Sequence, residues 1–257
     1  MRADLFLFTN GHVKSRQKAK TLIENQCVLI DGKAISKPSH EIDEQTEHKI
    51  EITDNCIYVS RGGLKLEAIL DYAKIDVNGK ICLDIGASTG GFTDCLLKRG
   101  ASKVFALDSG SNQLDMDLKN DSRVVSIENF NARNDLVEVV SDTIDVITID
   151  VSFISQTLII PSAFKTLGED GIYISLIKPQ FEVGKSGIGK GGIVKDKKFR
   201  KLAVLRVMEC ARTYGYHCNF LIKSPILGGD GNTEYLAVFS KNGESIPNEK
   251  IINIINS

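Results

Sequence analysis

The sequence predicts an α/β fold, a doubly wound and mostly parallel Rossmann-like sheet preceded by a small α+β domain. The first observation is an alternation of strand-like and helix-like segments from residue 59 onward, which is typical of parallel strands joined by crossover helices. The second is a different pattern over the first fifty residues, where two helical segments precede a hairpin. Hydrophobic residues make up 42 % of the 257-residue chain and charged residues 25 %, which are ordinary values for a globular protein with a core.

The N-terminal segment is expected to form two helices and a short antiparallel sheet. Helical spacing of apolar residues covers 3–10 and 14–25, with Ser15 as a plausible N-cap of the second helix. Asp31-Gly32 is a dipeptide typical of a tight hairpin turn. The expected strands are 28–30, 33–35 and 49–52.

The longer C-terminal segment is expected to supply the doubly wound sheet. Its strands are predicted at 81–85, 104–107, 124–127, 144–149, 172–177, 219–223 and 235–240. Its helices are predicted at 63–72, 93–99 and 197–214. We therefore expect an N-terminal domain over 1–55, a linker over 56–60 and a larger domain over 61–257.

Several classes of protein are disfavoured by composition. No run of about 18 apolar residues predicts a membrane-spanning helix, and no cleavable secretory signal is recognisable, so the cytoplasm is the expected location. The six cysteines are scattered without a CxxC pair or a Cys/His cluster, so no metal site is expected.

Positive charge is concentrated near the N-terminus, although the whole chain has a net charge of −1. Residues 1–40 contain seven Lys or Arg side chains against three Asp or Glu, whereas 41–54 contain six acids and one lysine. A cluster of positive charge at the N-terminus of a near-neutral chain is typical of a protein that binds an anionic partner through that region. A Lys/Arg-rich helix face that is merely solvated is the alternative.

A glycine-rich loop follows the strand at 81–85 and is the candidate cofactor site. Asp84 lies near the end of that strand, and Asp108 ends the next one, where an acid is placed to bind a ribose diol. The pattern GxxxGG, with Ser88 at its third position, departs from the GxGxxG of dinucleotide-binding loops. An acid at the strand end suits the cationic S-adenosylmethionine better than a pyrophosphate. A plain strand–turn–helix connection is the other interpretation.

A second glycine-rich segment, residues 184–191, almost matches the phosphate-binding pattern GxxxxGK[ST]. Gly191 follows Lys190 where a hydroxyl residue would hold Mg²⁺. We expect a mobile loop on the substrate side or an inert flexible loop rather than a nucleotide site.

Four charged residues lie in apolar surroundings and form the candidate catalytic set. Asp150 and Lys178 end apolar strands, Glu234 opens the last strand, and Lys65 lies on the helix before the first strand of the larger domain. A single residue of this kind more often belongs to a structural ion pair, but four of them at one edge of a sheet favour a catalytic role.

The chemistry that fits this set is methylation of a hydroxyl group, in which a base removes the hydroxyl proton. A lysine amine does so near neutral pH only where burial or a neighbouring cation lowers its pKa from about 10.4. Two neighbouring lysines would supply that effect while the two carboxylates hold them in place.

The sequence resembles the haemolysin A (TlyA) family of methyltransferases over essentially its whole length. The resemblance rests on the strings RADLFL, SRQKAKTLIE, VLIDGK, VSRGGLKL, DIGASTGGFTD, IDVSFIS, KPQFEVGK and GNTEYL. It implies an S4-type RNA-binding module followed by an FtsJ-like domain that uses S-adenosylmethionine. It also implies 2′-O-methylation of cytidine in ribosomal RNA. The basic-x-aromatic-Val linker motif expected in this family is replaced here by Cys56-Ile57-Tyr58-Val59.

The resemblance also assigns roles to individual residues. The K-D-K-E tetrad of FtsJ-like enzymes falls on Lys65, Asp150, Lys178 and Glu234, with Lys178 at the acceptor hydroxyl. Donor binding falls on Asp84, Gly86, Ala87, Ser88, Thr89, Gly90, Gly91, Phe92 and Asp108, and Asn131 matches a position that contacts adenine. The residues expected to bind RNA phosphates are Arg2, Lys14, Arg16, Lys18 and Lys20. A second basic patch that could add RNA contacts comprises Lys195, Lys197, Lys198, Arg200 and Lys201.

Two other classes of function stay open. A protein that binds RNA or ribosomes with a decayed active site is disfavoured because all four tetrad positions are occupied. A membrane-active haemolysin is disfavoured because no strongly apolar amphipathic helix is present.

Overall fold

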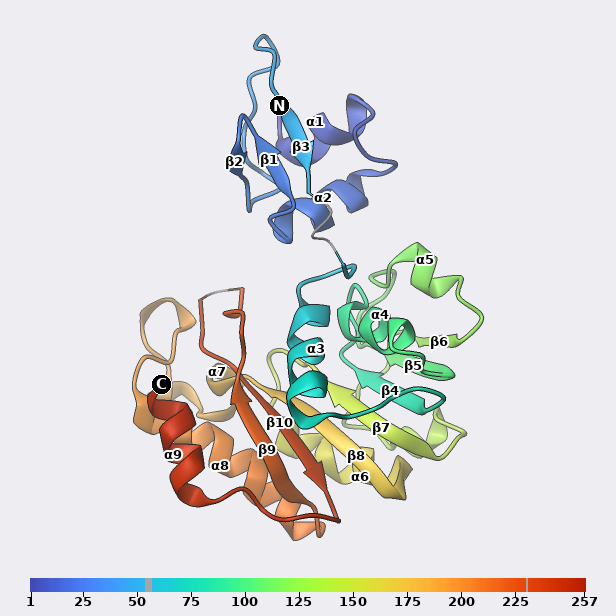
Figure 1. The fold of residues 1–257 in the computed structure, drawn as a ribbon, viewed down its shortest axis with the longest axis vertical. Helices are drawn as coiled ribbons and strands as arrows, with labels where there is room; N and C mark the ends of the chain where they lie inside the picture. The colour runs from blue at the N-terminus through green and yellow to red at the C-terminus, as the bar shows by residue number, and fades with distance from the viewer. Residues whose placement is uncertain (54–56, 230) are drawn as a thin grey trace. The chain divides into compact units, whose positions relative to one another are not determined.

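The computed structural model describes residues 1–53, 57–229 and 231–257 and divides the chain into two compact units, Met1–Gly63 and Leu64–Ser257. Figure 1 shows the elements of both units. The linker motif predicted at 56–59 begins at Cys56, which lies outside the described residues.

The N-terminal unit packs two helices against a three-stranded antiparallel sheet. Helices α1 (Ala3–Thr9) and α2 (Arg16–Glu24) contact each other, and the strand order is β2-β1-β3. The strands are β1 (Val28–Ile30), β2 (Lys33–Ala34) and β3 (Ile50–Ile52). The predicted N-cap is confirmed, because Ser15 Oγ accepts a hydrogen bond of 3.1 Å from the Lys18 amide. The predicted turn is confirmed by positive φ at Asp31 and Gly32.

The C-terminal unit is built on a seven-stranded sheet of order β6-β5-β4-β7-β8-β10-β9. The strands are β4 (Ile81–Ile85), β5 (Lys103–Leu107), β6 (Val124–Ile127), β7 (Ile144–Ile149), β8 (Leu167–Ile177), β9 (His217–Lys223) and β10 (Tyr235–Ser240). Strands β4 to β8 are parallel, and β10 pairs antiparallel with both β8 and β9. The predicted doubly wound, mostly parallel sheet is therefore confirmed.

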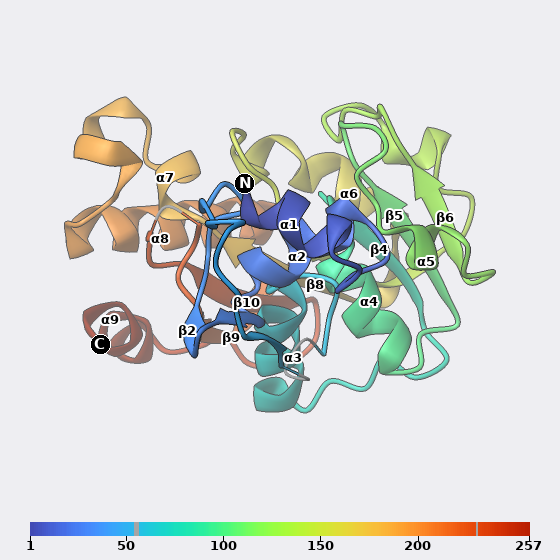
Figure 2. The ribbon, with the colours of Figure 1, turned by 90° about the horizontal axis from the view of Figure 1, so that it is seen from above.

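Helices connect these strands on both faces of the sheet. They are α3 (Gly62–Ala73), α4 (Gly91–Lys98), α5 (Met116–Lys119), α6 (Ile160–Thr166), α7 (Pro179–Glu182), α8 (Lys197–Thr213) and α9 (Asn248–Asn256). The short 3₁₀ turns are η1 (Leu136–Glu138), η2 (Gln156–Leu158), η3 (Lys185–Gly187) and η4 (Lys190–Gly192). Figures 1 and 2 show α3 and α4 on one face and α6 and α8 on the other.

Several elements differ from the prediction. Helix α4 begins at Gly91, two residues before the predicted start, because Gly90 with φ +95° supplies its N-cap. Strand β8 begins at Leu167 rather than at 172, since its polar first half still pairs with β7 at Leu167. Helices α5, α6, α7 and α9 were not predicted, and strand β9 begins at His217, two residues before its predicted start.

Alternation along the strands decides which side chains reach which face. Leu83 and Ile85 of β4 belong to the hydrophobic cluster that also contains Ile160 of α6 and Val204 of α8. Asp84 lies between them and therefore points to the opposite face, where α4 packs.

Candidate active site

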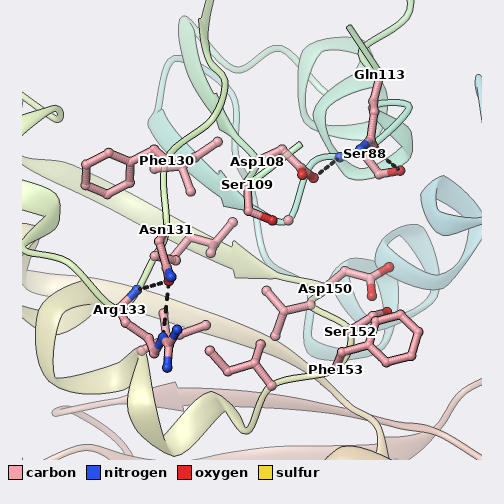
Figure 3. Close-up of a pocket in the computed structure, with 17 residues that line it drawn as sticks. Ser88, Asp108, Ser109, Gln113, Phe130, Asn131, Arg133, Asp150, Ser152 and Phe153 are labelled. Atoms are coloured by element: carbon pink, nitrogen blue, oxygen red, sulfur yellow. Dashed lines mark hydrogen bonds between the residues drawn. The ribbon is translucent and has the colours of Figure 1, made fainter. Parts of the chain in front are cut away.

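A cavity of about 450 Å³ lies beyond the carboxyl ends of the parallel strands, where ligands bind in open α/β sheets. Its walls come from the segments that follow β4, β5, β6 and β7 (Figure 3). Of the predicted site residues, it is lined by Gly86, Ser88, Asp108, Asn131 and Asp150. The other predicted loop residues, Ala87, Thr89, Gly90, Gly91 and Phe92, and the tetrad members Lys65, Lys178 and Glu234, are not part of this lining.

Gly86 occupies a position that excludes any side chain. Its φ is +84°, and a Cβ atom built there would lie 2.4 Å from the backbone oxygen of Asp150. Because that neighbour is backbone, it cannot swing aside. The glycine therefore lets the ends of β4 and β7 approach each other at the wall of the cavity.

Asp108 and Asn131 face the cavity from two neighbouring strand ends. The Asp108 carboxylate accepts a hydrogen bond of 2.8 Å from the Ser88 amide (Figure 3). It also accepts one of 2.7 Å from the Gly110 amide, and the two bonds fix its orientation. Asn131 Oδ1 accepts a hydrogen bond of 3.1 Å from the Arg133 amide. Two further lone pairs on the Asp108 oxygens suit the two hydroxyls of a ribose.

Asp84 lies behind the cavity wall rather than in it. It is fully buried, and it accepts hydrogen bonds from Thr93 Oγ1 of α4 (2.7 Å) and Thr148 Oγ1 of β7 (3.0 Å). Burial raises the pKa of Asp84 to about 7. The carboxyl thus ties β4 to the helix and the strand on either side of the glycine loop.

We expect Asp84→Asn to flatten the dependence of stability on pH. As pH rises from about 4 to about 7, the unfolded chain ionises Asp84 while the native state keeps it protonated, so ionisation favours unfolding. The shift corresponds to about 4 kcal/mol of unfolding free energy lost by the parent over that range. Urea denaturation at several pH values measures the difference between parent and variant. Parallel curves across that range would contradict the prediction.

The four tetrad residues form two ion pairs. Lys65 Nζ lies 2.6 Å from Glu234 Oε2, and both side chains are almost fully buried. Lys178 Nζ lies 2.5 Å from Asp150 Oδ1 and donates a hydrogen bond of 3.0 Å to Ser152 Oγ. Each lysine therefore has a carboxylate partner from a distant part of the chain.

Strand register brings the two pairs to one edge of the sheet. Tyr235 of β10 pairs with Ile177 of β8 in antiparallel register, so Glu234 and Lys178 are the next residues on adjacent strands. Asp150 follows β7, which is parallel to β8 on its other side. The expected convergence of the set at a single edge is therefore seen in the order and register of the strands.

Sequence reasoning did not single out the segment 152–154, which lines the same cavity. Phe153 is 91 % exposed with φ +63°, and its ring lies 5.2 Å from that of Phe181. Figure 3 shows Asp150, Ser152 and Phe153 grouped at one end of the cavity. The rule that ligands bind beyond strand ends could have found this segment, since it directly follows β7.

In the N-terminal unit, two predicted RNA-binding arginines share one carboxylate. Arg2 Nε lies 3.0 Å from Asp4 Oδ1, and Arg16 Nε lies 2.8 Å from Asp4 Oδ2. Burial raises the pKa of Asp4, but the hydrogen bonds from the two arginines outweigh it and hold the pKa at about 2. Lys14 and Lys18 are exposed, and Lys20 is half-buried.

The second basic patch and the surroundings of the second glycine-rich segment make hydrogen bonds to backbone groups of the C-terminal unit. In the second basic patch, Lys197 Nζ donates to the Asn256 carbonyl and Arg200 Nε donates to the Val194 carbonyl. Just after the second glycine-rich segment, the Val194 amide donates a hydrogen bond to buried Asn232, and the Asn232 side chain donates one to the Gly192 carbonyl. These contacts anchor the residues that directly follow the segment.

Two features are absent from residues 1–53, 57–229 and 231–257. No group of three or more His, Cys, Asp and Glu side chains there is arranged to hold a metal ion. Nor does this part of the chain contain a helix of the length and apolarity needed to cross a bilayer.

Comparison with known proteins identifies the family of each unit. Residues 1–48 match the S4 domain, and residues 58–241 match the FtsJ-like methyltransferase family. The chain is 47 % identical to Hemolysin A of Brachyspira hyodysenteriae, covering 93 % of this chain and 99 % of that protein. It is 41 % identical to the 16S/23S rRNA (cytidine-2′-O)-methyltransferase TlyA of Mycobacterium tuberculosis, covering 91 % and 87 %.

Solved structures agree with these sequence relatives. A Streptococcus thermophilus chain described as a candidate hemolysin superposes with a TM-score of 0.77 at 38 % identity, covering all of this chain and 94 % of that one. The resemblance stated from the motifs is thereby confirmed. The chain, which carries an N-terminal S4 domain, belongs to the FtsJ-like methyltransferase family, in the group of TlyA and Hemolysin A proteins.

Proposed function

We propose that the protein transfers a methyl group from S-adenosylmethionine to the 2′-hydroxyl of a cytidine in ribosomal RNA. The observation that carries the proposal is the pair of lysine–carboxylate contacts at the sheet edge, with Asp150 also lining the cavity. The choice of cytidine and of ribosomal RNA as substrate follows the names of the TlyA relatives, which are rRNA (cytidine-2′-O)-methyltransferases. We expect the protein to act in the cytoplasm, where ribosomal RNA is available.

The donor would occupy the cavity between the strand ends. Asp108 would bind its ribose and Asn131 its adenine, while the absence of a side chain on Gly86 leaves room at the wall. Of the loop 86–92, Gly86 and Ser88 line the cavity, and we expect the other residues to act through the shape of the loop. Because Asp84 lies behind the wall, we propose that it acts on the donor through the loop.

The chemistry assigned to the tetrad is removal of the hydroxyl proton. S-adenosylmethionine supplies an electrophilic methyl carbon when bound. Lys178, with its amine unprotonated, would accept the proton that the 2′-hydroxyl loses as its oxygen takes the methyl group from the sulfur of the donor. Asp150 holds Lys178, while Lys65 and Glu234 support it from the adjacent strand.

RNA binding is assigned to both units. The S4-type domain, which we place at 1–55 before a linker at 56–60 and a catalytic domain at 61–257, would bind phosphates through Arg2, Lys14, Arg16, Lys18 and Lys20. Asp4 would hold Arg2 and Arg16 in fixed orientations. Phe153, exposed at the cavity, would contact the target base, because a pyrimidine stacks on an aromatic ring.

We expect the double variant Lys14→Gln, Lys18→Gln to bind ribosomal RNA more weakly and with a shallower salt dependence. Each lost phosphate contact lowers the slope of log affinity against log salt by about one unit. Filter binding at several salt concentrations measures this slope. Lys49→Gln is the matched control, since Lys49 is an exposed lysine of the same unit paired with Glu51. An unchanged slope in the double variant would remove these lysines from the interface.

The function is tested by incubating the purified protein with S-adenosylmethionine labelled in its methyl group and with ribosomal subunits or naked ribosomal RNA. The proposal predicts label in RNA that depends on the protein. Tight RNA binding without any transfer would instead support the non-catalytic RNA-binding alternative.

A further inference from the structure

A buried polar network joins the segments that follow β7 and β8, and it includes residues outside the tetrad. The segment 151–155 follows β7 and carries Ser152 and Phe153 into the cavity wall. The segment after β8 begins at Lys178 and continues into α7, which ends at Glu182. Side-chain hydrogen bonds connect these two segments at both ends.

Lys178 makes the contacts at the first end. Its Nζ lies 2.5 Å from Asp150 Oδ1 and donates to Ser152 Oγ at 3.0 Å. The contact with Ser152 is a hydrogen bond, whereas the contact with Asp150 is an ion pair whose Oδ1 atom lacks hydrogen-bond geometry. The ion pair holds the nitrogen in place, and the hydrogen bond to Ser152 fixes one N–H bond, which restricts the direction of the lone pair when the nitrogen is an unprotonated amine. Ser152 therefore contributes to the orientation of the Lys178 amine.

Glu182 makes the contacts at the second end. Its Oε2 accepts from Ser155 Oγ at 2.5 Å, and its Oε1 accepts from the Gln156 amide at 2.8 Å. Glu182 is 1 % exposed, and burial raises its pKa. A buried carboxyl costs free energy unless its hydrogen bonds compensate, and here both oxygens bind the same short segment.

Gln156 attaches this end to the core of the sheet. Its Nε2 donates to the Leu176 carbonyl at 2.7 Å, and its Oε1 accepts from Ser175 Oγ at 2.6 Å. Gln156 and Ser175 are both buried. The segment 151–155 is therefore held between the end of β7 and an immobile point on β8, with Phe153 in a left-handed conformation between them.

We propose that Glu182 is a positioning residue for catalysis, which fixes the segment 151–155 so that Ser152 can orient the amine of Lys178. This inference rests on the proposed methyl transfer. Glu182 touches neither the cavity nor the tetrad side chains in the contacts above, so its effect passes through Ser152.

The test is a double-mutant cycle on methyl transfer with Glu182→Gln, Ser152→Ala and the double variant. We expect each single change to lower kcat by about tenfold, while the Kd for S-adenosylmethionine measured by calorimetry changes less than about threefold. Because Glu182 is proposed to act through the Ser152–Lys178 contact, which Ser152→Ala already removes, we expect the double variant to be no slower than Ser152→Ala. Hydrogen exchange of the amides in 151–156 is expected to quicken in Glu182→Gln, a readout that needs no activity.

Asp142→Asn is the matched control, because it changes a carboxylate to an amide in the pair with Lys103, which lies at the N-terminal end of β5. If Glu182→Gln does not fold, Ser155→Ala removes the contact from the other side and is expected to slow kcat by a few-fold. A double variant in which the two losses multiply, or a Glu182→Gln enzyme as fast as the parent, would overturn the inference. Absence of transfer by the parent itself would instead refute the proposed function, and unchanged hydrogen exchange would then refute the positioning role as well.

Discussion

Replacing Lys178 with alanine is expected to lower kcat for methyl transfer by about 100- to 10,000-fold, the usual contribution of a general base. The Kd for S-adenosylmethionine is expected to stay within about threefold of the parent, because the Lys178 side chain contacts Asp150 and Ser152 rather than lining the cavity. Single-turnover transfer of labelled methyl groups measures the first quantity and calorimetry the second.

Lys165→Ala is the control for that experiment. Lys165 is an exposed lysine whose Nζ lies 2.7 Å from Asp135 Oδ2, and it is not part of the cavity wall. The control should transfer methyl groups at the parent rate. If Lys178→Ala did the same, a lysine base could not be part of the mechanism.

Replacing Gly86 with alanine is expected to weaken S-adenosylmethionine binding by at least about tenfold. A Cβ atom there lies 2.4 Å from the Asp150 carbonyl oxygen, so the ends of β4 and β7 must separate where the donor would bind. Calorimetric titration measures the affinity, and thermal unfolding reports the accompanying strain.

Gly79→Ala separates crowding from backbone strain. Gly79 has a similar φ of +71°, but a Cβ atom built there has nothing within 4 Å. This variant should lose about 1 kcal/mol of stability through its positive φ and keep the affinity of the parent. Equal affinity in the Gly86 and Gly79 variants would show that close approach at Gly86 plays no part in binding.

Strand ends were the most predictable part of the site. Apolar segments that finish on Asp108, Asp150 and Lys178 mark carboxyl ends of parallel strands, and the structure has all three at the same edge of the sheet. The register that places Glu234 beside Lys178 depends on antiparallel pairing between β10 and β8, which no local pattern encodes.

Side-chain direction and buried partners were not predictable in the same way. Asp84 looks like a cavity residue in the sequence, but alternation along β4 turns it toward Thr93 and Thr148. Phe153 looks like an ordinary apolar residue, and only its backbone conformation and exposure show it at the cavity. The contact of Asp4 with Arg16 likewise depends on the packing of α1 against α2.

Among the helices that were missed, α6 and α9 are the longest, and their sequence signals are weak. Helix α6 has seven residues with a proline in its first turn and follows the 3₁₀ turn η2, so no sustained helical period is visible. Helix α9 has Pro247 rather than a hydroxyl or amide residue at its N-cap. Burial of Ile251 and Ile255 in the main cluster stabilises it instead.

The most direct test of the account is to locate the transferred methyl group. Ribosomal RNA incubated with the protein and S-adenosylmethionine is digested to nucleosides and analysed by mass spectrometry, with Lys178→Ala in parallel. The account predicts cytidine methylated on its ribose, formed by the parent and not by the variant. A methyl group on a base, or equal ribose methylation by both proteins, would contradict it.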